Sequence, residues 1–249
     1  GGGRLAVVDD IAEGVVYALT EKDLVGTKIV VTAGPTVEDI DPVRSITNRS
    51  SGKMGTAVAR VAAMRGARVE LVHGPLKVAA PSTPGITAHA VRSAREMFDA
   101  TMRAIDGADV AILAAAVADA RPARVATKKR KKTKGELARI ELEPTDDSRA
   151  TLGERRATSK ATTPLLVGFA AETGNVAKYA RDKLVRKQID LVCANDVAEA
   201  GSGFDVDTNR VLLVKRHGRD RWLAHSTKEE AAARILDEVL DMLHSSTAP

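Results

Sequence analysis

The alternation of strand-like and helix-like segments constrains the fold of this chain more than any other feature of its sequence. Short runs rich in β-branched residues alternate with stretches whose apolar residues recur at helical spacing. This order predicts an α/β fold of the Rossmann-like, doubly wound kind, with a mainly parallel sheet and helices on both faces. The expected strand segments are 28–36, 67–75, 108–119, 139–144, 164–172 and 190–196, and the expected helices are 56–66, 94–105 and 176–187.

The last part of the chain departs from this alternation. The runs RVLLVKR and RWLAHS flank the polar turn HGRD, which predicts an antiparallel hairpin at one edge of the sheet, before a closing helix over 228–243. At the other end, residues 5–26 carry only a short amphipathic pattern. We therefore expect 1–26 to be a connecting segment and 27–249 to form one domain.

About 17 residues between the first strand and the first helix show no regular pattern in the sequence. Long loops inside compact domains are usually functional or disordered. We therefore expect an irregular loop with a functional role at this point.

Composition limits the class and the location of the protein. No apolar run reaches the roughly 18 residues of a membrane span, and the N-terminus lacks a basic region followed by an apolar signal core. A cytoplasmic location without membrane attachment is therefore expected. The single cysteine, Cys193, lies in the apolar run DLVCAND, which favours a small buried residue over a nucleophile.

The formal net charge of +5 comes from one local cluster. Without it, 32 of the 38 basic residues remain, against 33 acidic ones, and aromatic residues make up only 2% of the chain. Basic residues are thus not spread over a face, and few aromatic side chains exist on which bases could stack. These counts disfavour a nucleic-acid-binding module. The cluster consists of Lys128, Lys129, Arg130, Lys131, Lys132 and Lys134.

Four segments rich in polar and small residues follow expected strands. In an open parallel sheet, ligands bind outside the carboxyl ends of the strands. Because all four segments belong at that edge, we expect the binding site there. They are Thr32–Gly55, Ala114–Lys134, Phe169–Gly174 and Ala194–Phe204.

The stretch Ser50-Ser51-Gly52-Lys53-Met54-Gly55 opens the first expected helix. A helix N-terminus carries unpaired backbone N–H groups and a partial positive charge, so Ser51, Gly52, Lys53 and Met54 are candidates for binding a phosphate. In the alternative interpretation, a serine merely caps the helix and the lysine is solvated. The stretch matches neither the Walker pattern nor G-x-G-x-x-G, which disfavours a generic NTPase and a standard dinucleotide oxidoreductase.

Three further side chains of the expected loops could bind a ligand. Arg44 offers a fork of donors suited to phosphate or carboxylate, and Asn48 offers both a donor and an acceptor. Asp119 is expected to end the most hydrophobic strand at the carboxyl edge of the sheet. Each could instead be a turn or capping residue.

The basic cluster and the helix after it offer further cations. Between two expected strands, the cluster could be a flap whose lysines close over phosphates, or a solvated charge run. Lys183 and Lys187 lie one helical turn apart on one face. Surface solvation would also explain them.

Together these motifs resemble one family. The stretches DPVRSITNRSSGKMG, AAAVAD, GFAAETGN and KLVRKQIDLVCAND, with the K-x-K-K pattern at Lys129–Lys132, are similar to the phosphopantothenoylcysteine synthetase half of the bifunctional bacterial enzyme of coenzyme A biosynthesis. The resemblance covers roughly Thr27 to Leu243. It implies that 27–249 is a CTP-dependent synthetase domain, and that 1–26 is the connection to an FMN-dependent decarboxylase half that would precede it.

The resemblance implies a two-step ligation. The carboxylate of 4′-phosphopantothenate attacks the α-phosphate of CTP with Mg²⁺ present, which gives an acyl-cytidylate and pyrophosphate. The amine of L-cysteine then displaces CMP. The family also implies a homodimer, for which the edge hairpin is a plausible surface, and a higher oligomer when the decarboxylase half is attached.

Individual positions match functional positions of the family. Asn48 matches the residue that contacts the acyl carbonyl of the intermediate, and Arg44 one implicated in the second step or in binding phosphopantothenate. Lys129, first in the K-x-K-K pattern, matches the flap lysine needed when cysteine attacks. No metal ligands can be assigned from the sequence.

The nucleotide site is implied in the same way. The backbone of Leu113, Ala114 and Ala115 is implied to form a wall beside the base. Other positions that match nucleotide contacts are Asp119, Thr145, Asp146, Asp147, Ser148, Phe169, Lys183 and Lys187. The sequence also departs from the family: Arg130 replaces an apolar residue of the flap, and Ser148-Arg149 stands where two apolar residues are usual.

One alternative class remains beside the nucleic-acid-binding module. A Rossmann-type NADPH-dependent reductase would need a glycine fingerprint and an acidic ribose-binding residue after the second strand. His73-Gly74-Pro75 follows that strand instead.

Overall fold

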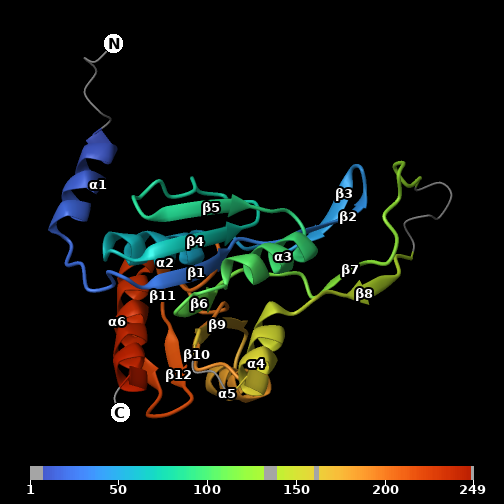
Figure 1. Ribbon diagram of the computed structural model, residues 1–249. Helices are drawn as coiled ribbons and strands as arrows, with labels where there is room; N and C mark the ends of the chain where they lie inside the picture. Colours follow the sequence, from blue (N-terminus) through green and yellow to red (C-terminus); the bar gives the residue numbers. More distant parts are fainter. Residues whose placement is uncertain (1–7, 132–138, 160–162, 248–249) are drawn as a thin grey trace.

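The computed structural model describes residues 8–131, 139–159 and 163–247, and an eight-stranded sheet forms its centre (Figure 1). The strands lie in the order β13-β12-β10-β9-β6-β1-β4-β5. Neighbours from β10 to β5 are parallel, whereas β12 and β13 form an antiparallel hairpin at one edge. The predicted fold class is therefore confirmed. The strands are β1 Lys28–Ala33, β4 Arg68–His73, β5 Ile86–Ala90, β6 Val110–Leu113, β9 Leu165–Glu172, β10 Leu191–Asp196, β12 Leu212–Lys215 and β13 Arg221–Trp222.

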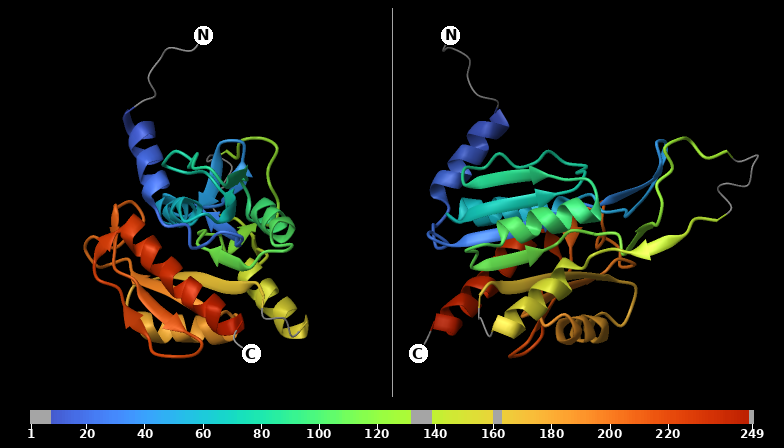
Figure 2. Two further views of the ribbon diagram at one scale, coloured as in Figure 1. Left: turned by 60° about the vertical axis from the view of Figure 1, so that its left-hand side comes forward. Right: turned by 45° about the vertical axis from the view of Figure 1, so that its right-hand side comes forward.

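Helices cover both faces of the sheet (Figure 2). Because successive side chains of a strand point to opposite faces, Ile29 and Val31 pack with α2 and α6, whereas Leu166 and Val192 pack with α5 on the other side. Cys193 packs in the core between the sheet and helices α2 and α6, where it is 1% exposed, as predicted. Burial raises the pKa of its thiol. The helices are α1 Val8–Leu19, α2 Lys53–Met64, α3 Ala94–Ala104, α4 Ser148–Ser159, α5 Val176–Arg186 and α6 Lys228–Thr247.

The segment after β1 is not the irregular loop that we expected. It forms a hairpin from β2 (Val37–Asp41) and β3 (Arg44–Thr47). Three of the five residues in the run VEDID are acidic, and because Asp and Glu are depleted in strands, the sequence did not reveal it. The carboxylate of Asp41 closes the turn by accepting the backbone N–H groups of Val43 at 2.8 Å and Arg44 at 2.9 Å.

Other boundaries also differ from those expected. The strand predicted over 108–119 ends at Leu113, so Asp119 does not end it. The segment 139–144 contributes only β8 (Leu142–Pro144), which pairs with β7 (Ala120–Pro122) outside the main sheet. Helix α4 was missed because Leu152 is its only large buried side chain, and β5 because it is a short, largely exposed edge strand.

The chain reverses its direction across the sheet beside β1. From β1 it proceeds to β4 and β5 on one side, and it then returns to place β6 on the other side. Such a switch point leaves a crevice at the carboxyl ends of the two strands, where open α/β sheets bind ligands. The β2–β3 and β7–β8 hairpins project from the same end of the sheet (Figure 1). A further small antiparallel sheet pairs β11 (Thr208–Asn209) with β14 (Ser226–Thr227), which flank β12 and β13 in the sequence.

Candidate functional site

Two adjoining cavities occupy the crevice at the switch point. The larger has a volume of about 300 Å³ and the smaller about 160 Å³. Residues of all four segments predicted from the sequence line the larger cavity, so the structure brings these segments together. The residues that line both cavities are Ala115, Val117, Asp119 and Arg149.

The N-terminus of α2 forms one wall of the larger cavity. Gly52 has φ +81° and caps the helix without any side-chain hydrogen bond, so the capping role considered for the serines is wrong. Ser50 Oγ accepts from Gly52 N at 3.3 Å, and Ser51 Oγ donates to the carbonyl of Phe204. The first N–H groups of α2 therefore remain available to an anion.

Close packing fixes this helix end against the sheet. A Cβ atom added to Gly55 would lie 2.6 Å from Ala33 Cβ, and one added to Gly52 would lie 2.3 Å from Leu76 Cδ2. Only glycine permits such a close approach of the helix to β1. The start of α2 is thus held directly above the end of the central strand.

Two lysines tie the loop 203–207 to this end of α2. Lys53 Nζ donates to Asp205 O at 2.9 Å and to Asp207 Oδ1 at 2.6 Å. Lys228, which is 5% exposed, donates to Gly203 O at 3.0 Å, and burial, followed by the charge of Lys53, lowers its pKa. Lys228 also lines the larger cavity and was missed from the sequence. A lysine at the start of a helix, where the helix dipole disfavours it, was the available signal.

Asn48 lies in the wall of the larger cavity, on the side of β3. Its Nδ2 donates to the carbonyl of Ala116 at 2.7 Å, which ties the end of β3 to the segment that follows β6. The same segment is bridged to the end of β1, where Ala116 N donates to Gly34 O at 2.9 Å. Asn48 is therefore held where the ends of β1 and β6 lie side by side.

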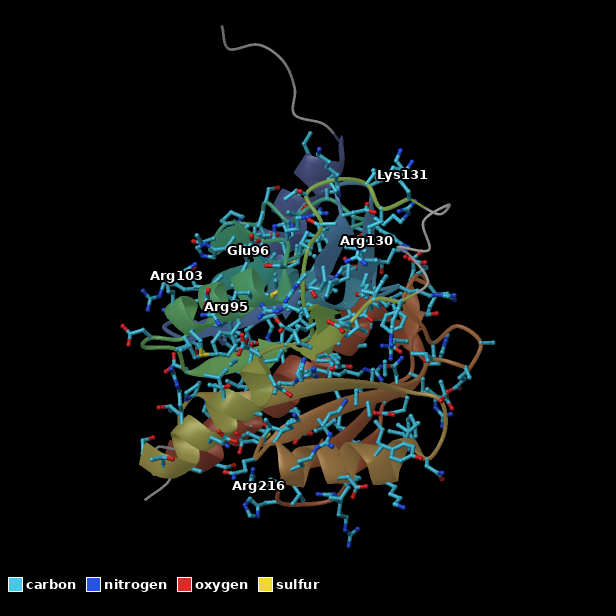
Figure 3. All side chains as sticks on the ribbon, turned by 90° about the vertical axis from the view of Figure 1, so that its right-hand side faces the viewer. Arg95, Glu96, Arg103, Arg130, Lys131 and Arg216 are labelled. Carbon is cyan, nitrogen blue, oxygen red and sulfur yellow. The ribbon has the colours of Figure 1, made fainter. Side chains whose placement is uncertain are left out.

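Arg44 and Lys129 lie outside the walls of both cavities. Arg44 Nη1 pairs with Asp41 at 2.8 Å and donates to Arg130 O at 3.3 Å, and Arg130 N returns a bond to Asp41 at 3.1 Å. These contacts attach the beginning of the basic cluster, of which Arg130 and Lys131 are labelled in Figure 3, to the β2–β3 hairpin. Lys129 is exposed, and Lys132 and Lys134 lie outside the described residues.

Hydrogen bonds make the smaller cavity rigid. The predicted backbone wall is anchored where Ala115 N donates to Thr32 Oγ1 at 3.1 Å. Thr145 N donates to Asp119 O at 3.1 Å, and its hydroxyl donates to Ala118 O. Leu113 and the residues Thr145, Asp146, Asp147 and Ser148 line this cavity, whereas Ala114 lines the larger one.

The acidic residues of the site differ in their partners. Asp146 accepts from Arg95 at 3.2 Å. Asp147 is paired with Lys187, and it also caps α4 by accepting from Arg149 N at 3.0 Å. In the described part of the chain, the carboxylate of Asp119 has no hydrogen-bond or ion-pair partner.

Phe169 and Lys183 lie together on the far wall of the larger cavity. Arg149 Nη1 donates to Phe169 O at 3.0 Å, and Lys183 lies 3.7 Å from Glu172 Oε1. Burial is the main cause that lowers the pKa of Lys183, and the charge of Arg149 adds to it. Arg149 and Asn195, which also line this cavity, were not predicted.

The described residues contain neither a metal-type cluster nor a membrane-spanning helix. Within those ranges, no three or more His, Cys, Asp or Glu side chains are grouped so that they could hold a metal ion. No described helix is both long enough and apolar enough to span a membrane.

A doubly wound sheet with an open helix N-terminus and several lysines at its switch point is typical of α/β domains that bind phosphate-containing ligands. The family model described as "DNA/pantothenate metabolism flavoprotein C-terminal domain" matches residues 24–243. The chain therefore belongs to this family.

Curated and solved relatives agree with that assignment. The Coenzyme A biosynthesis bifunctional protein CoaBC of Vibrio cholerae is 43% identical over 90% of this chain and 53% of its own length. A Cysteine/Cysteine sulfinic acid decarboxylase from an unknown prokaryotic organism is 41% identical over 98% of this chain and 68% of its own length. The crystal structure of the C-terminal domain of a CoaBC protein superposes with a TM-score of 0.75 at 40% identity, and covers 90% of this chain and 100% of that domain. The chain spans about half the length of the CoaBC protein of Vibrio cholerae.

Proposed function

We propose that this chain ligates 4′-phosphopantothenate to L-cysteine, with CTP as the co-substrate and an acyl-cytidylate as the intermediate. One observation carries the proposal: the walls of the two cavities combine an uncapped helix N-terminus, lysines and an unpaired carboxylate. The identity of 40% to a solved CoaBC C-terminal domain over that domain's whole length supports the same assignment.

A carboxylate is a poor acyl donor. The reaction must therefore first convert one of its oxygens into a good leaving group. Attack of the carboxylate oxygen on the α-phosphorus of CTP forms the acyl-cytidylate and releases pyrophosphate. The amine of cysteine then attacks the acyl carbon, loses a proton, and displaces CMP. Such chemistry depends mainly on positioning and on positive charge near the phosphates.

Asn48 is suited to the acyl group of the intermediate. Its bond to Ala116 O uses one of the two amide hydrogens and fixes the orientation of the side chain. The second hydrogen is left to donate to the carbonyl oxygen, where negative charge develops as the amine attacks. The N–H groups of Gly52–Met54 would bind a phosphate on the adjacent wall.

Asp119 is the side chain best suited to hold Mg²⁺. Magnesium ions in nucleotide sites are bound by one or two carboxylates together with substrate phosphates and water, and Asp119 lines both cavities without a partner among the described residues. The ion would neutralise charge on the phosphates. Lys183 and Lys228 would contribute further positive charge to the larger cavity.

Two further proposals concern the assembly of the protein. Residues 1–26 would connect this domain to a decarboxylase half, although Leu24 already packs into the core, where it is 0% exposed. The domain itself would form a homodimer, which sedimentation velocity on the purified chain would detect.

One assay tests the activity. The purified chain is mixed with CTP, 4′-phosphopantothenate and Mg²⁺, and pyrophosphate is measured before and after L-cysteine is added. The proposal requires pyrophosphate in the absence of cysteine, and CMP with 4′-phosphopantothenoylcysteine after its addition. A chain that forms neither pyrophosphate nor ligated product would refute it.

A further inference from the structure

Arg149 lies at the junction of the two cavities. Of the four residues that line both, it is the one with a positive charge. It belongs to the first turn of α4, whose N-terminal end also faces the smaller cavity through Ser148. A positive charge at this junction would contact a ligand that extends from one cavity into the other.

The structure holds the Arg149 side chain at both ends. Its backbone N–H donates to Asp147 Oδ1 at 3.0 Å, and its stem passes beside Gly168, where an added Cβ would lie 3.7 Å from Arg149 Cδ. Its Nη1 donates to Phe169 O at 3.0 Å. The guanidinium group is therefore tied to the wall, and the residue as a whole is half-buried.

The end of β6 explains why Phe169 O is open to this bond. On β9, Leu165 N donates to Asp109 O on the β6 side, and residues two apart on a strand direct their backbone groups to the same side. Phe169 O therefore faces β6 as well. Strand β6 ends at Leu113, which is paired with Gly168, so no residue of β6 lies beside Phe169. One N–H group of Arg149 fills this place, and other donors of its fork remain for a ligand.

Lys183 brings a second positive charge to the same cavity. Its side chain is 22% exposed, and its one ion-pair partner among the described residues, Glu172, lies 3.7 Å away. The charge of Arg149 acts on it, because after burial it is the next cause that lowers the pKa of Lys183. Arg149 and Lys183 thus both line the larger cavity, and the ion pair with Glu172 is the one that the structure shows for either of them among the described residues. An anion beside the two cations would stabilise both charges.

The neighbouring lysine does not share this property. Lys187 forms an ion pair with Asp147, whose second oxygen caps α4. That pair is already neutral, so it offers an incoming anion little net attraction.

We propose that Arg149 and Lys183 together bind one phosphate group of a substrate, across the larger cavity from the N-terminus of α2. The inference rests on the proposed function, since CTP and 4′-phosphopantothenate are the two sources of such a group. An arginine fork can donate two hydrogen bonds to one phosphate, and a lysine adds a point charge beside it. The two walls would then hold different phosphates of the bound substrates.

Calorimetric titration of the full chain tests this pair without relying on turnover. CTP with Mg²⁺, 4′-phosphopantothenate and inorganic pyrophosphate are titrated separately into the wild type, Arg149→Met, Lys183→Met and the double variant. Arg155→Met is the matched control, because Arg155 is an exposed arginine of the same helix. Arg149→Lys keeps the charge without the fork, and thermal unfolding of every variant checks the fold.

If the two residues bind one phosphate, Arg149→Met and Lys183→Met should lower the affinity for the same substrate, either CTP or 4′-phosphopantothenate. The expected loss is about tenfold or more, as for a charged hydrogen bond. The double variant should lose less than the product of the two single losses, and Arg149→Lys should recover part of the affinity. Arg155→Met should bind as the wild type does. Loss confined to CTP and pyrophosphate would assign the triphosphate, and loss confined to 4′-phosphopantothenate would assign the substrate ester.

Other outcomes would overturn the inference. Arg149→Met with a wild-type unfolding temperature and unchanged affinity for both substrates would leave Arg149 a structural residue that only satisfies Phe169 O. Single variants that affect different substrates would show that the two cations do not share a phosphate. A wild type that binds pyrophosphate through Arg149 and Lys183 yet forms no ligation product would instead refute the proposed function alone.

Discussion

Lys187 and Asp147 form an ion pair with each other at the edge of the smaller cavity. The resemblance to the family implied that both residues contact the nucleotide. Because Asp147 also caps α4 through its other oxygen, the pair joins α5 to α4 and thereby positions Arg149. We therefore expect this pair to act mainly on the shape and the stability of the site.

The ion pair predicts a specific response to acid. Burial alone would raise the pKa of Asp147, but the hydrogen bonds from Lys187 and Ala150 N and the charges of Arg149 and Lys187 together lower it in the folded state. A carboxyl with a lowered pKa stabilises the fold above its unfolded pKa of about 3.9, and this contribution is lost as the pH falls through the folded value. Lys187→Met should therefore unfold at a higher pH than the wild type during acid titration followed by circular dichroism.

Lys178→Met is the control for that measurement, because Lys178 is an exposed lysine on the same helix. Its acid midpoint should equal that of the wild type. Equal midpoints for Lys187→Met and the wild type would show that the ion pair does not stabilise the folded state.

Asn48→Ala should bind CTP normally and lose most of the ligation activity. The loss follows because the amide oriented by Ala116 O would no longer donate to the acyl carbonyl, and one such donor contributes about 2.7–4 kcal/mol to the transition state. Steady-state kinetics and a CTP titration measure the two effects separately. Wild-type turnover in this variant would remove Asn48 from the mechanism.

Gly55→Ala should destabilise the protein and weaken CTP binding, because its Cβ would lie 2.6 Å from Ala33 Cβ and push the start of α2 away from β1. Overpacking of this kind costs about 1–3 kcal/mol, and each kcal/mol shifts Tm by about 2–4 °C in a chain of this size. Gly14→Ala on α1 is the control, since nothing lies within 4 Å of its added Cβ. Equal unfolding temperatures for the two variants would contradict the close packing.

Lys129→Gln tests the flap interpretation of the basic cluster. If Lys129 acts when cysteine attacks, the variant should still release pyrophosphate but accumulate the acyl-cytidylate and pass little of it to cysteine. Quenched-flow mass spectrometry follows the intermediate and the product in one sample. Loss of pyrophosphate release would place Lys129 in the first step, and undiminished product would show that a neighbouring cation replaces it.

The sequence predicts the strands whose side chains are buried on both faces, and it predicts which segments meet at their ends. The runs that became β1, β9 and β10 are continuous and apolar, so their place in a parallel sheet follows from their composition. The β2–β3 hairpin was missed because its stability comes from an aspartate-closed turn and from contacts distant in sequence.

In the candidate site, too, features that are encoded locally could be predicted, whereas those that depend on distant partners could not. The start of α2 could be predicted, because a helix N-terminus is encoded locally by Ser50–Gly55. The position of Arg149 could not, since it depends on where β6 stops. The start of the last helix gave only an indirect signal for Lys228, whose place depends on the carbonyls of a loop 22 to 25 residues earlier in the sequence. Partners distant along the chain decide which charged residues stay available to a ligand.

Oxygen transfer tests the acyl-cytidylate most directly. 4′-Phosphopantothenate labelled with ¹⁸O in both carboxylate oxygens is ligated to L-cysteine by the wild-type chain with CTP and Mg²⁺, and the CMP is analysed by mass spectrometry. Because the attacking carboxylate oxygen stays on the α-phosphorus when the amine displaces CMP, each CMP molecule should carry one ¹⁸O atom. Unlabelled CMP beside ligated product would contradict activation of the carboxylate by the nucleotide.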